Sequence, residues 1–358
     1  MRITAVDVTP YALPFERPYV TARGRLERRE MVLVELHTDE GVVGLGEAVP
    51  LSLRGGPSLG TIERELREDW TAWLADRDVD ATELGSAKLP AGPSPPSRAA
   101  IEMALIDAAA RLAGVPAWRL LGAKAQRPIE CNATLAAGPP TTVAERAAGW
   151  LDRGFETLKL KVGVAGDVEQ VAAVRSAVGP EARIRVDANG VWSPPEAIER
   201  LTTMEHHGIQ LAEQPAADLE GLAAVRARTA IPIAADESVA TADDARRAVE
   251  LGSCQLATVK LAKVGGIGPA LEIDARLPVY LSSALDGPVG IAAAATAAQV
   301  LSREGIRAQL AHGLATQLLF EDTIASQACQ VRDGRLHLPD GHGLGVEIDA
   351  EALERHRL

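Results

Sequence analysis

The chain of 358 residues contains only three cysteines, seven histidines and 3% aromatic residues. The cysteines, Cys131, Cys254 and Cys329, are an odd number without metal-ligand spacing, which indicates a reducing compartment and no disulfide framework. The scattered histidines form no His-x-His or similar zinc motif. The longest apolar run, around VGIAAAATAAQVL, is too short and too alanine-rich for a membrane span.

Basic residues are fewer than acidic residues. Lys and Arg number 37 against 49 Asp and Glu, which gives a formal net charge of −12. Because no local basic patch offsets this charge, we expect no affinity for nucleic acid or for an anionic membrane. The first residues, MRITAVDVTPYALPF, alternate apolar and polar side chains and lack the features of a signal peptide. We therefore expect a cytoplasmic protein, and the sequence leaves open whether it forms a homo-oligomer.

The first 125 residues have the pattern of an α+β domain. Three alternating apolar runs are typical of strands, and the turn Asp39–Gly41 joins the last two as a hairpin. Helical periodicity follows at about 61–76 and 97–113. Strands followed by helices predict an α+β capping domain over residues 1–125.

After residue 125 strand-like and helical segments alternate strictly. The strand-like segments are IECNATL, TLKLKV, ARIRVD, IQLAEQ, IPIAAD, ATVK, PVYLSS and AQLAHG. Eight alternating units require parallel strands, and eight is the number that closes a TIM-type (β/α) barrel, which we predict over 126–325. Residues 326–358 contain turns without helical periodicity, so we expect them to return to the capping domain.

Five of these segments end on charged residues. In chain order these are Lys159 and Lys161, Asp187, Glu213, Asp236 and Lys260. From Lys161 onward they are 23 to 26 residues apart, the length of one strand, one helix and two loops. Because a parallel barrel keeps its active site at the carboxyl ends of its strands, we expect these side chains to meet at one mouth of the barrel.

The three carboxylates are candidate metal ligands. Taken singly, an aspartate in such a position is typical of a helix N-cap. Together, Asp187, Glu213 and Asp236 would repel one another strongly unless a cation neutralised them. Oxygen-only ligands favour Mg²⁺, with Mn²⁺ as a substitute.

The lysines are candidate proton-transfer groups. Lys159 and Lys161 lie on one face of a strand, roughly 7 Å apart at their bases, and Leu158 and Leu160 alternate with them. Repulsion of about 2.4 kcal/mol at that separation predicts a lowered pKa for one ammonium, as a general base requires. Lys260, on the sixth strand, is expected opposite Lys161, on the second. A substrate carboxylate held by the metal would then have one lysine on each face of its α-carbon.

At these residues the chain resembles the enolase superfamily, specifically its muconate-lactonizing-enzyme subgroup. The matching motifs are Lys159-Leu160-Lys161, Asp187-Ala188-Asn189, Glu213-Gln214-Pro215, Ala235-Asp236-Glu237-Ser238 and Lys260 within VKLAKVGGI. The resemblance covers essentially the whole chain. It implies a modified barrel with a capping domain, a Mg²⁺ ion and a small-molecule carboxylate substrate.

Three segments look most like o-succinylbenzoate synthase: CNATL, LSSALDGPVGIAAA and AHGLAT. That enzyme dehydrates 2-succinyl-6-hydroxy-2,4-cyclohexadiene-1-carboxylate in menaquinone biosynthesis. The resemblance implies that Lys161 removes the α-proton and protonates the departing hydroxyl, that Lys260 stabilises the enediolate, and that Lys159 assists. It further implies metal or substrate support from a set of four residues, Asn189, Glu237, Ser283 and Lys263.

Other activities of the subgroup stay open. N-acylamino acid racemases and dipeptide epimerases use the same two lysines, and muconate cycloisomerases share the fold. Dipeptide epimerases tend to carry an Asp-x-Asp motif after the eighth strand, where this chain has His312-Gly313-Leu314. A metal-dependent hydrolase would need histidine ligands, and a non-enzymatic barrel would be free to lose these charged residues.

The capping domain should supply part of the substrate pocket. We expect contributions from the segment RPYVTARG and from the loop Leu53–Gly56. Arg17 or Arg23 could meet a second substrate carboxylate, although loop arginines are more often solvated.

Overall fold

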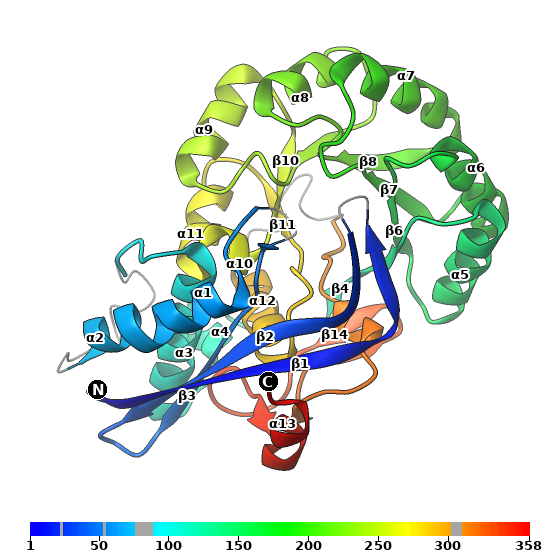
Figure 1. Cartoon of the computed structure of the whole chain (residues 1–358). Coiled ribbons are helices and arrows are strands. Elements are labelled where there is room, and N and C mark those ends of the chain that lie inside the picture. The colour runs from blue at the N-terminus through cyan, green and yellow to red at the C-terminus, as the bar shows by residue number, and fades with distance from the viewer. Residues whose placement is uncertain (22–23, 53–54, 76–88, 302–309) are drawn as a thin grey trace.

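The computed structural model describes residues 1–21, 24–52, 55–75, 89–301 and 310–358. Figure 1 shows an N-terminal sheet with its helices beside a ring of strands and outer helices, with the C-terminal segment below the sheet. Within the described ranges, no helix combines the length and apolar character that crossing a bilayer requires.

The N-terminal sheet is an antiparallel meander in the order β1 (Ile3–Thr21), β2 (Gly24–Thr38) and β3 (Val43–Ala48). The pairing of β2 with β3 confirms the predicted hairpin. The described residues of this part of the chain also form helices α1 (Leu59–Arg64), α2 (Thr71–Leu74), α3 (Pro95–Leu112) and α4 (Ala117–Leu120), with a π-helical turn, η2 (Glu65–Trp70), between α1 and α2.

Helix α3 packs directly on β3. Most of α3 is buried and rich in alanine, and β3 offers Gly44 and Gly46 to it. A Cβ atom at Gly44 would overlap the carbonyl oxygen of Ala104, and one at Gly46 would overlap that of Ala100. The two glycines therefore allow a backbone-to-backbone approach that fixes the helix on the sheet.

The second part of the chain forms a parallel seven-stranded sheet that curls into a barrel (Figure 1). Its strands, in spatial and chain order, are β5 (Asn132–Leu135), β6 (Thr157–Lys161), β7 (Arg183–Asp187), β8 (Ile209–Glu213), β9 (Ile233–Ala235), β10 (Leu256–Val259) and β11 (Val279–Leu281). The helices between and after them are α5 (Pro140–Asp152), α6 (Asp167–Val178), α7 (Pro194–Met204), α8 (Leu219–Arg226), α9 (Ala242–Leu251), α10 (Leu261–Val264), α11 (Ile267–Asp274) and α12 (Pro288–Val300), with the short η3 (Glu205–His207).

In its described part, the expected eighth strand closes the ring through isolated bridges. Of the predicted segment 308–313, residues 308 and 309 lie outside the described ranges. His312 forms a parallel bridge with Cys131, beside β5, and Gly313 forms one with Ser282, beside β11. The His312 amide donates to the Glu130 carbonyl at 2.7 Å, and the Gly313 amide donates to the Leu281 carbonyl at 2.8 Å. This segment therefore joins the first and seventh strands of the barrel.

The C-terminal residues contact both parts of the molecule. They form η5 (Thr316–Leu319), β12 (Ala325–Gln327), β13 (Gln330–Arg332), β14 (Arg335–His337), β15 (Glu347–Ile348) and α13 (Ala350–His356). A short strand, β4 (Ile129–Glu130), precedes the barrel. Strand β14 pairs with β4 at the start of the barrel. Helix α13 contacts β1, and the Leu358 amide donates to the Pro10 carbonyl at 3.0 Å. The chain end thus contacts the N-terminal sheet.

Candidate active site

Strand β6 directs two lysines into the barrel. Leu158 and Leu160 are fully buried in the core shared with the surrounding helices, so Lys159 and Lys161 point inward, as the alternation predicted. Both lysines are almost completely buried. The Lys161 ammonium donates to Asp187 Oδ2 at 2.6 Å and to Asn189 Oδ1 at 2.9 Å. The register of β6 and β7 places Lys161 directly beside Asp187.

Three carboxylates follow one another around the same rim. Asp187 ends β7, Glu213 ends β8, and Asp236 comes directly after β9. Strand register pairs Asp187 with Glu213, and none of the three residues is more than 1% exposed. The structure therefore brings together the three candidate metal ligands named from the sequence.

Lysine charges balance these carboxylates. Lys159 donates to both oxygens of Glu213 at 2.7 Å and lies 2.9 Å from Asp187 Oδ2. Burial raises the pKa of Asp187, but Lys159 and Lys161 outweigh it and hold that pKa well below its usual value. Burial and the charge of Asp187 raise the pKa of Glu213, and Lys159 offsets only part of this rise.

The predicted lowering of a lysine pKa is wrong for Lys159. Burial does lower the pKa of this ammonium, but the charges of Asp187 and Glu213 act in the opposite direction and leave it well above the usual value. The sequence argument considered only repulsion between Lys159 and Lys161. In the structure, each lysine also forms an ion pair with a carboxylate, which favours its charged form.

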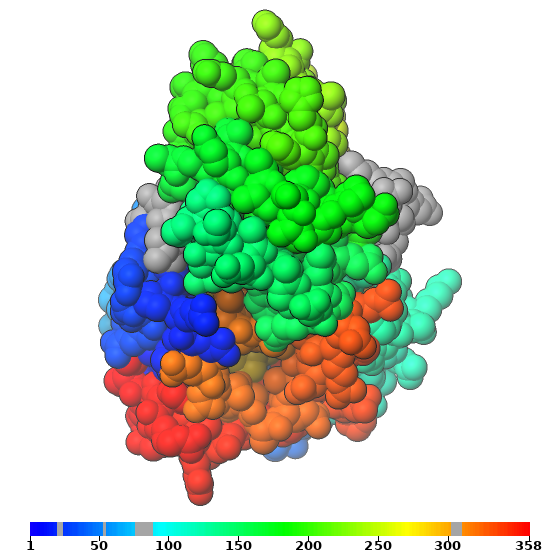
Figure 2. All heavy atoms as spheres, turned by 90° about the vertical axis from the view of Figure 1, so that its right-hand side faces the viewer, coloured from blue at the N-terminus to red at the C-terminus, as the bar shows by residue number. Residues whose placement is uncertain are grey.

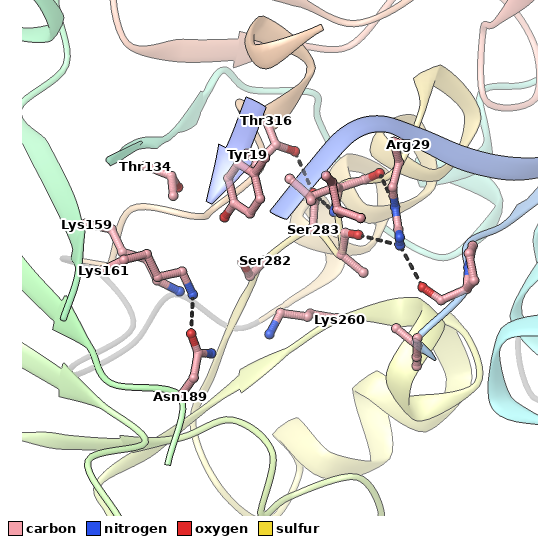
Figure 3. A pocket seen from close by; sticks show the side chains of 15 residues that line it. Tyr19, Arg29, Thr134, Lys159, Lys161, Asn189, Lys260, Ser282, Ser283 and Thr316 are labelled. Atoms are coloured by element: carbon pink, nitrogen blue, oxygen red, sulfur yellow. Dashed lines mark hydrogen bonds between the residues drawn. The ribbon is translucent and has the colours of Figure 1, made fainter. Parts of the chain in front are cut away.

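Lys260 reaches the rim from the opposite wall. It follows β10 and donates to Asp236 Oδ2, while Lys263, one turn later, lies 3.0 Å from Asp236 Oδ1. Figure 3 shows Lys161 and Lys260 pointing from opposite sides into the same space. The expected opposition of these two lysines is therefore present.

The remaining residues named from the sequence lie at or beside this space. The Asn189 amide nitrogen donates to Glu237 Oε1 at 3.1 Å, and Asn189 has a left-handed backbone with φ of 50°. Ser283 lines the pocket, where its hydroxyl lies 2.5 Å from that of Thr316 and accepts from the Leu285 amide at 2.8 Å.

The pocket between the two lysines has a volume of about 90 Å³ and receives side chains from both parts of the chain. The N-terminal part contributes five residues, Tyr19, Leu26, Arg29, Pro50 and Leu51. Tyr19 belongs to the segment predicted to contribute, whereas Arg23, Leu53 and Arg54 lie outside the described residues. Arg17 lines a neighbouring cavity instead.

Arg29 connects the capping sheet to the loop after β11. Its guanidinium donates to three carbonyl oxygens, those of Pro50 at 2.8 Å, Ala284 at 2.9 Å and Leu285 at 3.3 Å. Leu285 has φ of 66°, a conformation that non-glycine residues rarely adopt. Sequence reasoning missed Arg29, because nothing in its own segment indicates a contact more than 250 residues away.

A second layer of polar side chains lies deeper in the barrel. The Tyr280 hydroxyl donates to Glu213 Oε2, and the Arg185 guanidinium stacks over the Tyr280 ring at 5.0 Å. Arg185 also donates to Gln210 and to the Ala311 carbonyl, each at 2.8 Å. These residues were not predicted, although the alternation of PVYLSS would place Tyr280 and Ser282 on one face of a strand.

The carboxylates fit a hard divalent cation in donor type and in burial. The charges of Asp187 and Asp236 both raise the pKa of Glu213. In this structure, lysine ammonium groups contact the oxygens of all three. Among the described residues, no three acidic, histidine or cysteine side chains are already arranged around one point as a metal site. A cation would therefore replace ammonium groups as the partner of these oxygens.

Two ranges of the chain match the models of known protein families. Residues 3–122 match the model described as the N-terminal domain of mandelate racemase and muconate lactonizing enzyme. Residues 142–352 match the model described as enolase C-terminal domain-like. The two matches together span most of the chain.

Several characterised relatives are similar over most of their length. L-Ala-D/L-Glu epimerase of Bacillus subtilis is 34% identical over 309 residues, which cover 82% of this chain and 84% of the relative. The o-succinylbenzoate synthase of Geobacillus stearothermophilus is 29% identical over 365 residues, covering 96% and 93%. The structure of a dipeptide epimerase from Enterococcus faecalis, complexed with Mg and L-Leu-L-Tyr, superimposes with a TM-score of 0.88 at 29% identity, covering 97% and 100%.

Proposed function

This chain belongs to the mandelate racemase and muconate lactonizing enzyme family of the enolase superfamily, and from that premise we propose that it is an o-succinylbenzoate synthase. The proposed reaction is the dehydration of 2-succinyl-6-hydroxy-2,4-cyclohexadiene-1-carboxylate. The proposed cofactor is Mg²⁺, held by Asp187, Glu213 and Asp236, with Mn²⁺ as a substitute. The dipeptide epimerase of Enterococcus faecalis, whose structure is complexed with Mg, supports this assignment.

The observation that carries the proposal is the opposition of Lys161 and Lys260 across one pocket, beside three buried carboxylates. A proton can be removed from the α-carbon of a carboxylate only if the resulting negative charge is stabilised as it develops. When bound, the metal ion supplies positive charge to the substrate carboxylate. The two lysines supply proton transfer on one face and charge stabilisation on the other.

Lys161 is the proposed base. Acting as the neutral amine, it takes the α-proton, and the electron pair of the broken C–H bond moves into the carboxylate system. Lys260 stabilises the negative oxygen from the opposite wall. The electron pair then returns and expels the β-hydroxyl. Lys161 donates the proton to this hydroxyl, which leaves as water, and the lysine is thereby restored to its starting state. Lys159 donates to both oxygens of Glu213 and holds that carboxylate in position.

The eighth-strand segment supports a synthase over a dipeptide epimerase. A free dipeptide carries an α-ammonium that needs an acidic partner. Here His312, Gly313 and Leu314 occupy the region of the epimerase Asp-x-Asp motif, and Thr316 is the residue of this segment that reaches the pocket. No acidic side chain is among the described residues that line the pocket.

An N-acylamino acid racemase or dipeptide epimerase is the second candidate. It is favoured by the presence of two lysines on opposite walls, which a two-base racemisation requires, and by similarity to L-Ala-D/L-Glu epimerase. A muconate cycloisomerase, another activity of this subgroup, is the third candidate.

A paired assay of the purified protein with Mg²⁺ tests the proposal. One arm supplies the cyclohexadienyl carboxylate and follows the loss of its ultraviolet absorbance. The other incubates N-acylamino acids and dipeptides in deuterated water and measures α-proton exchange. Fast dehydration supports the synthase, whereas exchange without dehydration would reassign the chain to the racemase or epimerase group.

A further inference from the structure

The capping helix α3 contacts the barrel at the helices that follow β10 and β11. It packs on α10 and also touches α11 and α12 (Figure 1). Helices α5 and α6 lie on the opposite side of the ring, which faces the viewer in Figure 2. Lys260 directly precedes α10, whereas Lys161 ends β6, between α5 and α6 in the chain. Of the two opposed lysines, Lys260 is therefore the one whose following turn lies against α3.

Two side chains of α3 bind the turn between α10 and α11. The Arg98 guanidinium donates to the Gly265 carbonyl. The Glu102 carboxylate accepts from the Ile267 amide, and the Gly268 amide donates to both of its oxygens at 3.3 Å. Arg98 and Glu102 are one helical turn apart and pair with each other at 3.3 Å. Helix α3 thus supplies a donor to the end of α10 and an acceptor to the start of α11.

The turn has the backbone that this close approach requires. Gly265 and Gly266 have φ of 95° and 126°, in the left-handed region that favours glycine. A Cβ atom at Gly266 would overlap the Glu102 carboxylate. Arg98 is 9% exposed and Glu102 4%, so water has little access to replace either contact when a side chain is removed.

The same turn fixes the backbone of Lys260. The Lys260 carbonyl accepts from the Val264 amide at 3.1 Å, and the Leu261 carbonyl accepts from the Gly265 amide at 2.9 Å. Helix α10 is therefore one hydrogen-bonded turn, with Lys260 at its start and Gly265, bound to Arg98, at its end. A shift of this turn moves Lys260 with it.

We propose that Glu102, together with Arg98, is a positioning residue for Lys260. It holds from the capping domain the turn that carries this lysine, and so sets where the Lys260 ammonium meets the substrate. Neither side chain is among the described residues that line the active-site pocket, so both act through the turn. The inference rests on the proposed function for the role of Lys260, which is to stabilise the negative oxygen. A displacement of about 1 Å in such a group costs about 100-fold in rate.

Asp107 provides a matched control on the same helix. Like Glu102, it is buried, pairs with an arginine four residues away, Arg111 at 2.9 Å, and accepts from two backbone amides. These are the amides of Leu45 at 2.9 Å and Leu344 at 2.6 Å. They belong to β3 and to the C-terminal segment, away from the turn after Lys260. Loss of either carboxylate should lower stability, and only loss of Glu102 should change the chemistry.

Steady-state dehydration kinetics with Mg²⁺ test the proposal. Glu102→Ala should lower kcat about 10- to 100-fold and change KM less than about 3-fold, because Lys260 acts on charge that develops in the transition state. Glu102→Gln keeps an acceptor for the two amides and should recover most of kcat. Asp107→Ala should keep kcat within about 3-fold of the wild type, after correction for the folded fraction by circular dichroism.

Hydrogen exchange measured by mass spectrometry tests the hold on the turn without any turnover. The amides of residues 260–268 should exchange faster in Glu102→Ala than in Asp107→Ala, although urea unfolding should show a lower midpoint for both variants. Equal protection of this segment in the two variants, or equal losses of kcat, would overturn the positioning role.

The proposed function can fail separately. Absence of dehydration by the wild type would overturn the synthase assignment, and α-proton exchange of L- and D-N-acylamino acids in deuterated water then replaces the dehydration assay. Because Lys260 faces one side of the α-carbon, Glu102→Ala should slow exchange of one enantiomer and leave the other unchanged. Equal slowing of both enantiomers would overturn the inference.

Discussion

The hydroxyl of Tyr280 donates a hydrogen bond to the carboxylate of Glu213 from inside the barrel. Glu213 is thus held from two sides, by Tyr280 below and by the Lys159 ammonium at the rim. Glu213 is a proposed metal ligand, and a ligand that a neighbouring group holds in place is already oriented before the ion binds. Tyr280 is therefore expected to contribute to metal affinity without touching the metal or the substrate.

Tyr280→Phe should weaken Mg²⁺ binding about 10-fold, because Glu213 loses the group that orients it while the ring under Arg185 remains. Titration calorimetry measures the effect. Tyr11→Phe is a matched control, since the Tyr11 hydroxyl donates to another buried carboxylate, Glu47, at 2.9 Å. Both variants should lose about 1 kcal/mol of stability, and only the first should lose metal affinity. Equal Mg²⁺ affinities would contradict the orienting role.

The candidate site was largely predictable because β/α units repeat. A charge at the end of each strand meets its neighbours once the strands are parallel and in register, as Lys161 with Asp187 and Asp187 with Glu213 show. The confirmed outward direction of Leu158 and Leu160 follows from the two-residue period of a strand. Local periodicity therefore sufficed for the elements and for the residues at their ends.

Contacts that cross the molecule were not predictable in this way. Arg29 binds carbonyl groups from a loop that only the closed barrel brings near it. The direction of the Lys159 pKa depends on distances to Asp187 and Glu213, which strand order does not give. The eighth strand was expected from its composition, but its described part pairs through isolated bridges at His312 and Gly313. These contacts and the Lys159 pKa depend on distances between segments that are far apart in the sequence, which the periodicity of a single segment does not give.

Lys161→Ala should reduce turnover about 1000-fold or more, because the proposed base is lost. The fold should survive, since Asp187 keeps Lys159 at 2.9 Å as a charged partner. Steady-state kinetics and circular dichroism check the two parts. Leu158→Ala, on the opposite face of the same strand, should lower the free energy of unfolding by about 2 to 5 kcal/mol. The turnover of its folded fraction should change little. Near-normal turnover by Lys161→Ala would remove this lysine from the mechanism.

Asp236→Asn should lower both metal affinity and metal-free stability. Lys260 and Lys263 both contact the Asp236 carboxylate, and Lys260 is almost fully buried, so the substitution leaves positive charge in the interior with less compensation. The loss of stability should be about 3 kcal/mol. Thermal melts with and without Mg²⁺ measure it: Mg²⁺ should raise the Tm of the wild type and EDTA should reverse that rise, whereas the variant should melt lower and respond weakly. A variant that gains as much from Mg²⁺ as the wild type would exclude Asp236 as a ligand.

Glu47 should make the free energy of unfolding depend on pH. It is buried on β3, where it accepts hydrogen bonds from the Gly287 amide at 2.6 Å and the Val289 amide at 3.2 Å at the start of α12. Burial, and then the charge of Asp286, raise its pKa from 4.5 to about 7, although hydrogen bonds from Tyr11 and these amides act against the rise. The folded state therefore holds a proton that the unfolded chain releases between these pH values.

The sign of the effect follows from that proton. Stability from Glu47 is fully present below about pH 4.5 and is lost as the pH rises through about 7, a change of up to about 3 kcal/mol. Glu47→Gln cannot titrate, so its free energy of unfolding should fall less steeply between pH 5 and 7.5, as urea unfolding at several pH values would measure. Burial also raises the pKa values of Asp286, Glu102 and Asp107. A slope unchanged by Glu47→Gln would assign the pH dependence to the other carboxyl groups with raised pKa values, these three together with Glu213 and Glu35, because each of them also gains a proton on folding.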